Sequence, residues 1–415
     1  MGLPARATVT PGMQKKMVWA GSNLGSYGMA EEALGKLADQ AISLGRIRRQ
    51  LEAVGQERIA ERDQAIAALK SMPLPERRVG LVGQKAPALA VVMMDGGRYQ
   101  RRDHFGCPPT DDSAPAKSHW RESKVGCLLS MMSETFESDP CPDIPDNIAN
   151  AGAIREFAKM AEITGPNEEC SSLDIESSPT VDKVREEQEY EPPKRLSCEV
   201  VATSHSSDEF GWMLEARARQ LNFQAAPRQA YVADGAKTNW RIQRAHFPRA
   251  TPIADLMHAL AYAWSAADVA DEPDMFPKWA QLIWQGDVSE VIGHLRALQP
   301  NPQRPDVNPV PADRLSKIER SLTYFEKNCS HMNYPDYRRQ GLPLTSARIE
   351  STIKLINRRI KGTEKFWGKE TSESILQLCA DYLSDSDPMT RFWARYHANQ
   401  TGSNAYKNDS KICNV

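Results

Sequence analysis

Residues 209–253 alternate between helical and strand patterns, and this alternation strongly constrains the fold. The segment EFGWMLEARARQLNF (209–223) is amphipathic at helical spacing, and residues 230–233 form a short apolar run with β-prone residues. A second helix start near Lys237 follows at once, and residues 251–253 begin another short strand. Strands that are joined by helices usually pair in parallel through crossover connections. The segment therefore predicts an α/β fold.

Strand patterns also precede this segment. Residues 87–105 (PALAVVMMDGGRYQRRDHF) predict a strand, a tight Asp-Gly-Gly turn and a second strand, and residues 119–131 (HWRESKVGCLLSM) alternate as a third. Short connections between consecutive strands are typical of an antiparallel meander. Together with the parallel strands, the meander predicts a mixed sheet that is divided along the chain between residues 81–131 and 207–260.

Helical patterns flank the predicted sheet. Residues 28–72 carry apolar side chains at three- and four-residue steps, so residues 1–80 are expected to form a helical N-terminal region that Gly45 and Gly55 divide. Its piece ISLGRIRRQLEAVG could be a DNA-binding helix-turn-helix, although most helical hairpins with two arginines bind no DNA. The remaining expected parts are a helical insertion with a Pro-rich linker over 261–313, C-terminal helices over 314–395 and a tail over 396–415.

Two regions have a strong charge bias. Residues 132–195 hold 16 Asp and Glu against 6 Lys and Arg, within a Pro- and Ser-rich stretch over 132–206. Such a composition buries little apolar surface, so we expect an acidic, mobile insertion with at most two short helical patches. Residues 338–369 hold 9 Lys and Arg against 2 Glu, so the net charge of −2 does not argue against nucleic-acid binding.

Three carboxylates lie at positions where metal binding or catalysis is expected. Asp95 ends the apolar run ALAVVMM, Asp234 ends QAYVA, and Glu350 lies early in a basic helix. A meander, a parallel strand and a late helix that carry these residues follow the order of an RNase H-like catalytic core. Mg²⁺ prefers carboxylate oxygens, and two ions about 3.5–4 Å apart clamp the oxygens of a phosphoryl displacement. The pattern predicts metal ligands at Asp95, Asp234 and Glu350.

Each of these carboxylates also has a purely structural interpretation. The sequence Asp95-Gly96-Gly97 is by itself a hairpin signal. Asp234 could cap the helix that begins near Lys237, and Glu350 could pair with Lys354 one turn later. Spacing alone does not decide between these interpretations.

A resemblance adds to the spacing. It is carried by the stretches VVMMDGGR, HWRESKVGCL, YVADGAKTNWRIQRAHFP, IADLMHAL, YRRQGLPLTSARIESTIKLINRRIKG and WGKETSESILQL. From about residue 28 to residue 395, outside the acidic insertion, the chain resembles DDE transposases of bacterial insertion sequences. The similar branch is the ISKra-type one, which is related to the Mutator-like element transposases. The family usually has a Gly-rich P-I-G-S-G stretch where this chain reads PLTSARIE.

The resemblance implies an RNase H-like core with a helical insertion, and it assigns the catalytic triad to Asp95, Asp234 and Glu350. The family's Asp-x-x-His signature corresponds to Asp255 and His258, which are expected to orient DNA or a water beside the metal site. Without the family, these two residues would be a helix cap and a core histidine.

The implied reaction is cleavage at the terminal inverted repeats of a mobile element, followed by joining of the 3′-hydroxyl ends to target DNA. Mg²⁺ or Mn²⁺, as two ions, is the implied cofactor, and double-stranded DNA and further copies of the chain are the implied partners. Phosphate contacts are expected from the basic residues around Glu350, although such charge runs are usually solvated faces: Arg348, Lys354, Arg358, Arg359, Lys361 and Lys365.

Two alternatives remain open. The first is a truncated or decayed copy that binds inverted repeats without cutting, which the altered PLTSARIE stretch favours. The second is an RNase H-like nuclease that acts on RNA–DNA hybrids or junctions, for which the helical insertion is larger than needed. The chain has no run of about 18 apolar residues and no apolar signal segment at its start, so we expect a bacterial cytoplasmic protein without membrane contact.

Overall fold

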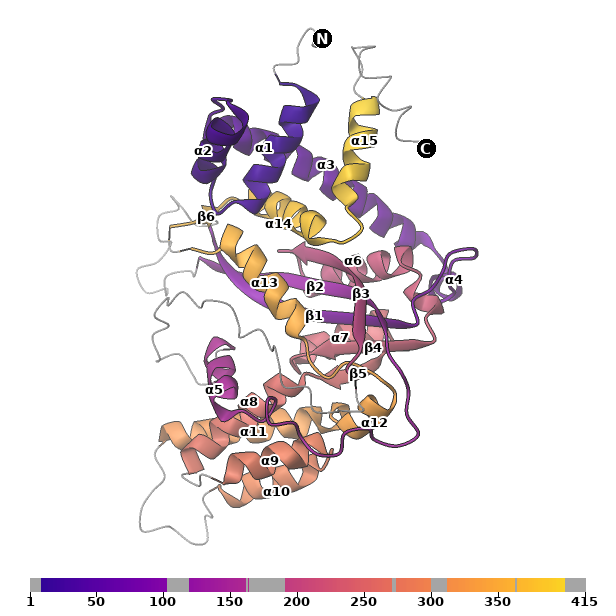
Figure 1. Ribbon diagram of the computed structural model, residues 1–415, viewed down its shortest axis with the longest axis vertical. Helices are drawn as coiled ribbons and strands as arrows, with labels where there is room; N and C mark the ends of the chain where they lie inside the picture. The colour runs from indigo at the N-terminus through magenta and orange to yellow at the C-terminus, as the bar shows by residue number, and fades with distance from the viewer. Residues whose placement is uncertain are drawn as a thin grey trace, which may run out of the picture.

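One mixed β-sheet forms the centre of the molecule (Figure 1). The computed structural model describes residues 9–102, 119–161, 163, 191–270, 274–299, 312–362 and 364–399. The strands found in these residues are β1 (Leu89–Arg101), β2 (Trp120–Met132), β3 (Lys194–Thr203), β4 (Arg228–Ala233), β5 (Thr251–Ala254) and β6 (Phe366–Trp367). Their order is β3-β2-β1-β4-β5, and β6 pairs with the far end of β1.

The parallel half of the sheet confirms the α/β prediction. β4 pairs in parallel with both β1 and β5, and helix α7 (Lys237–His246) connects β4 to β5. The apolar run of β1 over residues 89–94 is buried throughout, as is usual for a strand covered on both faces. Burial of each large apolar side chain stabilises the fold by about 1.5–3 kcal/mol, so this strand is a main part of the core.

The predicted hairpin at Asp95-Gly96-Gly97 is wrong. β1 continues through these residues, and its antiparallel register with β2 runs across them, with Asp95 opposite Val125. An Asp-Gly pair favours a turn locally, but the hydrogen-bond ladder with β2 holds the backbone extended at each residue. The first two strands of the predicted meander are therefore one strand, β1, and the third is β2.

β3 corrects the expected extent of the acidic insertion. Composition placed the whole of 132–206 outside the core, whereas Lys194–Thr203 pairs antiparallel with β2 as an edge strand. Its alternate residues Cys198, Val200 and Ala202 are buried, so the strand has a true core face. Residues 162 and 164–190 of this segment lie outside the described residues.

The N-terminal region is helical, as predicted, but the predicted divisions are wrong. Helix α3 runs through Gly55 without a break. This glycine packs so closely against a later helix that an added Cβ would lie 2.4 Å from the Cβ of Ser374. Residues 44–55 thus belong to one helix and not to a helix-turn-helix. The helices of this region are α1 (Pro11–Asn23), α2 (Tyr27–Ala38), α3 (Leu44–Ser71) and α4 (Leu74–Arg78).

Helices cover both faces of the sheet. An added Cβ at Gly126 would meet Leu214 of α6 (Ser207–Gln220), whereas the next residue, Cys127, donates from Sγ to Thr352 Oγ1 (3.4 Å) on α13 (Ala347–Ile360). Because successive strand residues point to opposite faces, α6 and α13 lie on opposite sides. α14 (Lys369–Leu383) packs on β3 and α3, and α15 (Pro388–Asn399) follows it.

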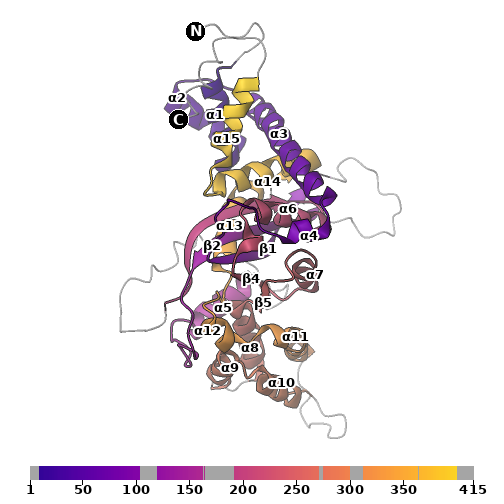
Figure 2. The same ribbon diagram turned by 90° about the vertical axis from the view of Figure 1, so that its right-hand side faces the viewer.

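The predicted helical insertion lies at the end of the molecule opposite α1 and α2, in both views (Figures 1 and 2). Helix α5 (Ala151–Met160), one of the expected short helical patches, packs against its first helix. The predicted range 261–313 contains most of α8 (Leu256–Ala270) together with α9 (Met275–Trp284) and α10 (Val288–Ala297). Two helices that were predicted among the C-terminal helices, α11 (Ala312–Asn328) and α12 (Tyr334–Arg339), pack against them. Among the described helices, none has the length and apolar composition needed to cross a membrane.

Candidate functional site

Three neighbouring parallel strands bring three aspartates into one row, at the level where β4 and β5 end and β1 continues. The register aligns Met94, Ala233 and Ala254 across β1, β4 and β5. The residues that directly follow are Asp95, Asp234 and Asp255. Because parallel strands end at the same edge of a sheet, these aspartates share the edge where open α/β sheets usually bind their ligands.

Asp95 is partly buried within β1. Its Oδ1 accepts a hydrogen bond from the N–H of Gly96 at 2.6 Å. Burial nevertheless raises the pKa of Asp95 to about 6, and the negative charges of Asp234 and Asp255 contribute to the rise. The protein environment therefore disfavours the ionised form of this carboxyl group in the absence of a nearby cation.

Asp234 holds the turn before α7 but is not its cap, because the N-cap residue is Ala236 and no described side chain caps this helix. Its Oδ1 accepts from the N–H of Ala236 (2.9 Å) and from Asn239 Nδ2 (2.7 Å), so it orders the start of α7. Gly235 between them has φ +96°, a left-handed conformation that favours glycine, and an added Cβ there would lie 2.8 Å from Tyr324. Asp234 thus holds a tight strand-to-helix turn while it remains in the aspartate row.

The predicted Asp255–His258 pair is formed. His258 Nδ1 lies 3.7 Å from Asp255 Oδ2, and Phe157 of α5 packs edge-on against the imidazole. Burial alone would lower the pKa of His258, but Asp255, followed by Asp234 and Asp95, raises it to about 9. This places a cationic side chain next to the aspartate row at neutral pH.

Asp255 also connects the sheet to the helix that carries the predicted glutamate. Its carboxylate accepts hydrogen bonds from the N–H of Ser346 (2.9 Å) and from the Ser346 hydroxyl, directly before α13. Burial would raise the pKa of Asp255, but donors from His258 and Ser346 keep it below its usual value. Asp255 is therefore a buried anion that fixes the start of α13.

Glu350 lies in the first turn of α13 and is partly buried. Burial raises its pKa to about 7, with a further rise caused by Asp255 and Asp95, and His258 and Lys354 oppose this rise. The five predicted residues Asp95, Asp234, Asp255, His258 and Glu350 are thus close enough to perturb one another electrostatically.

The donor set of this site fits a hard divalent cation. Within the described residues, Asp95 and Asp234 use only Oδ1 in hydrogen bonds, so Oδ2 of each is available to a ligand. The raised pKa values of Asp95 and Glu350 show uncompensated negative charge, which Mg²⁺ or Mn²⁺ would neutralise. In the described part of the chain, however, no three His, Cys, Asp or Glu side chains form a ready-made metal-ligand cluster.

Three of the predicted phosphate-binding residues have structural partners. Arg359 is buried, donates from Nε to the carbonyl of Gly21 (2.7 Å) and stacks over Tyr27 and Trp367. Because its guanidinium ties α13 to α1, Arg359 is not accessible to DNA and its predicted phosphate contact is wrong.

Arg348 and Lys365 are also engaged within the protein. Arg348 interacts with the Cys198 thiol on β3, on the side of α13 that faces the sheet. Lys365 Nζ donates to the carbonyl oxygen of Arg358 (3.0 Å), where it caps the end of α13. Both side chains are nevertheless half-exposed, so the phosphate contacts predicted for them stay predictions.

The remaining predicted residues, Lys354, Arg358 and Lys361, are exposed. They follow Glu350 at steps of four, four and three residues, which places them along one side of α13 and its end. We refer to Lys354, Arg358 and Lys361 as the α13 basic face. It leads away from the carboxylates along the helix.

Sequence reasoning missed several residues that shape the site. Ser346 binds Asp255, Asn239 binds Asp234, and Phe157 packs on His258. Asn239 carried a weak signal, because it lies five residues after a strand-ending aspartate. Ser346 and Phe157 are brought in from distant parts of the chain, so no local pattern could have indicated them.

In comparisons with known proteins, no family model matches the chain, and no curated protein matches it significantly.

Proposed function

We propose that the chain is a DDE transposase with an RNase H-like core. The observation that carries the proposal is the row of Asp95, Asp234 and Asp255 across three adjacent parallel strands, at the level where β4 and β5 end, with Glu350 in the same electrostatic site. The strand order β3-β2-β1-β4-β5, antiparallel in its first half and parallel in its second, supports an RNase H-like core.

In this proposal Asp95, Asp234 and Glu350 hold the cations. Two bound Mg²⁺ or Mn²⁺ ions would supply charge stabilisation at the attacking and leaving oxygens of an in-line phosphoryl displacement. Asp255 positions the start of α13 through Ser346, and so fixes where Glu350 enters the site. His258, held cationic by Asp255, would contact a phosphate oxygen of the DNA.

The proposed substrate is double-stranded DNA at the inverted repeats of a mobile element. Water would displace the 3′-oxygen at each end of the element, and the freed 3′-hydroxyl would then displace a 3′-oxygen in target DNA. The α13 basic face would bind the phosphate backbone without reading its sequence. We further propose that the chain self-associates to pair two ends and acts in the bacterial cytoplasm.

Cleavage of DNA that carries the element's own ends tests this proposal. The ends are read from the DNA that flanks the gene, and nicking is followed in Mg²⁺ or Mn²⁺. We expect wild-type protein and Asp208→Asn, which changes an exposed aspartate on α6, to nick the ends. Asp234→Asn should bind the same DNA without nicking it.

Other outcomes separate the alternatives. Wild-type protein that binds the ends but never nicks them would be a non-catalytic inverted-repeat binding protein. Nicking of RNA–DNA hybrids in preference to the ends, without strand transfer, would identify a nuclease. Equal cleavage by wild type and Asp234→Asn would contradict the assigned site.

A further inference from the structure

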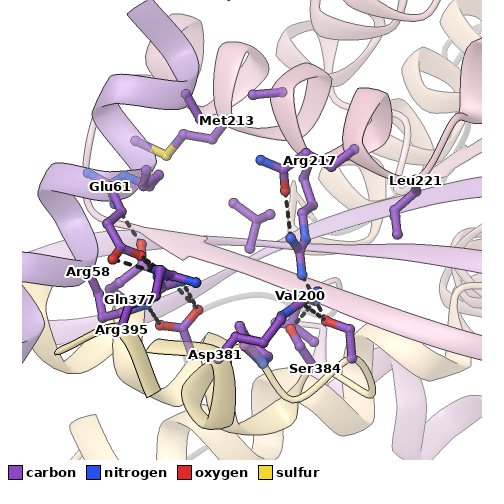
Figure 3. Close-up of a pocket in the computed structure, with 18 residues that line it drawn as sticks. Arg58, Glu61, Val200, Met213, Arg217, Leu221, Gln377, Asp381, Ser384 and Arg395 are labelled. Atoms are coloured by element: carbon purple, nitrogen blue, oxygen red, sulfur yellow. Dashed lines mark hydrogen bonds and ion pairs between the residues drawn. The ribbon is translucent and has the colours of Figure 1, made fainter. Parts of the chain in front are cut away.

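A second cavity lies at the opposite edge of the sheet, beside β3 and two strands away from β1. Its volume is about 450 Å³, which is within the range of small-ligand sites. The walls come from α3, α6, α14 and the start of α15, with β3 as the floor (Figure 3). Nothing in the proposed phosphoryl-transfer function uses this cavity.

The lining of the cavity is rich in arginine. Of the described residues that line it, five are arginines and two are carboxylates: Arg58, Arg62, Arg217, Arg391, Arg395, Glu61 and Asp381. In Figure 3, Arg217 reaches down from α6 toward the chain near Ser384, and Arg58 and Arg395 lie across the cavity from it. Carboxylates behind the lining offset part of this charge, because Arg217 pairs with Glu199 and Arg62 pairs with Glu373.

Some of these arginines are already paired, which shows which ones remain for a ligand. Arg58 donates from Nε to Asp381 Oδ2 (2.8 Å) and from Nη1 to Glu61, so it is saturated by carboxylates. Arg62 donates from Nη1 to Glu373 Oε1 (2.7 Å), but its Nη2 is buried without a partner in the described structure. A buried N–H donor without an acceptor is costly and indicates a missing partner.

Two arginines of the cavity have guanidinium N–H donors that form no hydrogen bond in the described structure. Arg391 and Arg395 lie one turn apart on α15. In the described structure, Arg391 donates only from Nη2 to Ser386 Oγ (3.1 Å), and Arg395 donates only from Nη2 to Glu61 (2.9 Å). A guanidinium has five N–H donors in a planar fork, so both can still bind an anion in a bidentate manner.

The lining also contains apolar side chains, next to the arginines (Figure 3). These side chains come from β3, α3 and α6: Ala65, Val200, Val201, Met213, Ala216 and Leu221. An inorganic anion would leave this surface uncovered. A ligand that fills the cavity therefore combines an anionic group with a flat or apolar body.

We propose that this cavity binds a mononucleotide unit, either free or at the 5′ end of a DNA strand. The phosphate would lie between Arg62, Arg391 and Arg395, and the base would cover Val201 and Met213. Arginine suits this task because its planar fork matches two phosphate oxygens. The aliphatic side chains provide the apolar surface that a base needs.

Binding of dAMP, measured by isothermal titration calorimetry in EDTA, tests the proposal. Wild-type protein should bind dAMP more tightly than inorganic phosphate. Arg391→Gln and Arg395→Gln should each weaken binding about tenfold, because each removes charged hydrogen bonds to the phosphate. Arg296→Gln is the matched control, because Arg296 is also exposed and paired with one glutamate, Glu326, and it should bind as wild type does.

Further variants test the apolar lining of the cavity and whether dAMP binding is independent of the proposed catalytic site. Ala65→Phe, on the partly exposed side of α3, should fill the cavity and abolish dAMP binding without replacing a buried side chain. Asp95→Asn should bind dAMP normally, so failure of the proposed catalytic site would leave this result unchanged. A 5′-phosphorylated oligonucleotide that displaces dAMP would assign the site to strand ends, and failure to displace it would assign the site to free nucleotides.

Three results would overturn the proposal. They are the absence of dAMP binding to folded wild-type protein, equal affinity for dAMP and inorganic phosphate, and an equal loss of affinity in Arg296→Gln and Arg391→Gln.

Discussion

At the scale of single residues, the carboxyl groups of the candidate site differ in how the fold compensates their charge. Asp255 is fully buried yet keeps a lowered pKa, because His258 and Ser346 stabilise its anion. Asp95 and Glu350 have fewer such partners, and burial raises their pKa values to about 6 and about 7. Asp255 therefore has a structural role, whereas Asp95 and Glu350 are suited to bind a cation.

Removal of these uncompensated charges should stabilise the protein when no metal is bound. At pH 8 we expect Asp95→Asn to raise the free energy of unfolding by up to about 2 kcal/mol, since the buried charge is lost. Glu350→Gln should act in the same direction. Urea unfolding in EDTA measures both effects, and Asp208→Asn serves as the exposed control.

The same substitutions should reverse their effect when metal is present. Millimolar Mg²⁺ or Mn²⁺ should raise the melting temperature of wild-type protein and of Asp208→Asn, and leave Asp95→Asn and Glu350→Gln unchanged. An equal metal-induced rise in all four proteins would show that the cation binds elsewhere.

Metal affinity should also depend on pH. The Glu350 carboxyl group loses its proton near pH 4.5 when unfolded and near pH 7 when folded, so the metal-free folded state binds more protons between these values. Its free energy of unfolding therefore falls as pH rises through this window. Because a metal must displace the proton, Mn²⁺ affinity should weaken by up to about tenfold per pH unit below 7.

Titration of Mn²⁺ at pH 6, 7 and 8 by electron paramagnetic resonance measures this dependence. Glu350→Gln removes the titrating group, so its residual Mn²⁺ affinity should change less with pH. A wild-type affinity that is constant from pH 6 to pH 8 would contradict the assignment of Glu350 as a ligand.

At the scale of elements, local sequence patterns predicted the parallel strands. They failed to predict structure that depends on pairing between distant parts of the chain. β4 and β5 carry their own signals, because each is a short apolar run before a helix start. β3 was hidden because the acidic residues before it dominate the composition of the segment. The sequence Asp95-Gly96-Gly97 favours a turn, but pairing with β2 keeps these residues in an extended strand. That pairing is visible only in the three-dimensional structure.

Helix α3 gives a direct test of how long-range packing overrides a local signal. Gly55→Ala should destabilise the protein by about 1–3 kcal/mol, because its Cβ would overlap Ser374 of α14. Gly35→Ala in α2, where an added Cβ meets no described atom within 4 Å, should stabilise it by about 0.5–1 kcal/mol. Urea unfolding of the two variants should thus give opposite signs, and a stabilising Gly55→Ala would contradict the close α3–α14 contact.

At the scale of the whole molecule, the sequence predicted a basic cluster but not which of its members face solvent. Helical periodicity groups Lys354, Arg358 and Lys361 on one side, yet Arg359 was placed with them although it points into the core. Its partners, Gly21, Tyr27 and Trp367, lie in distant parts of the chain. A basic residue that is buried in this way has no signal in its neighbouring sequence.

The α13 basic face should therefore account for a defined part of the salt dependence of DNA binding. Substitution of Lys354, Arg358 or Lys361 by Gln should each reduce the slope of log affinity against log salt by about 0.9, if each neutralises one phosphate. The three changes should be roughly additive and should leave the melting temperature unchanged.

Arg359→Gln should leave the salt slope unchanged and lower the melting temperature, because it leaves the buried partners of Arg359 without a cation. Fluorescence anisotropy with duplex DNA from 50 to 300 mM salt, together with thermal unfolding, distinguishes the two classes. If Arg359→Gln changes the salt slope while folded and Lys354→Gln does not, the DNA path cannot follow this side of α13.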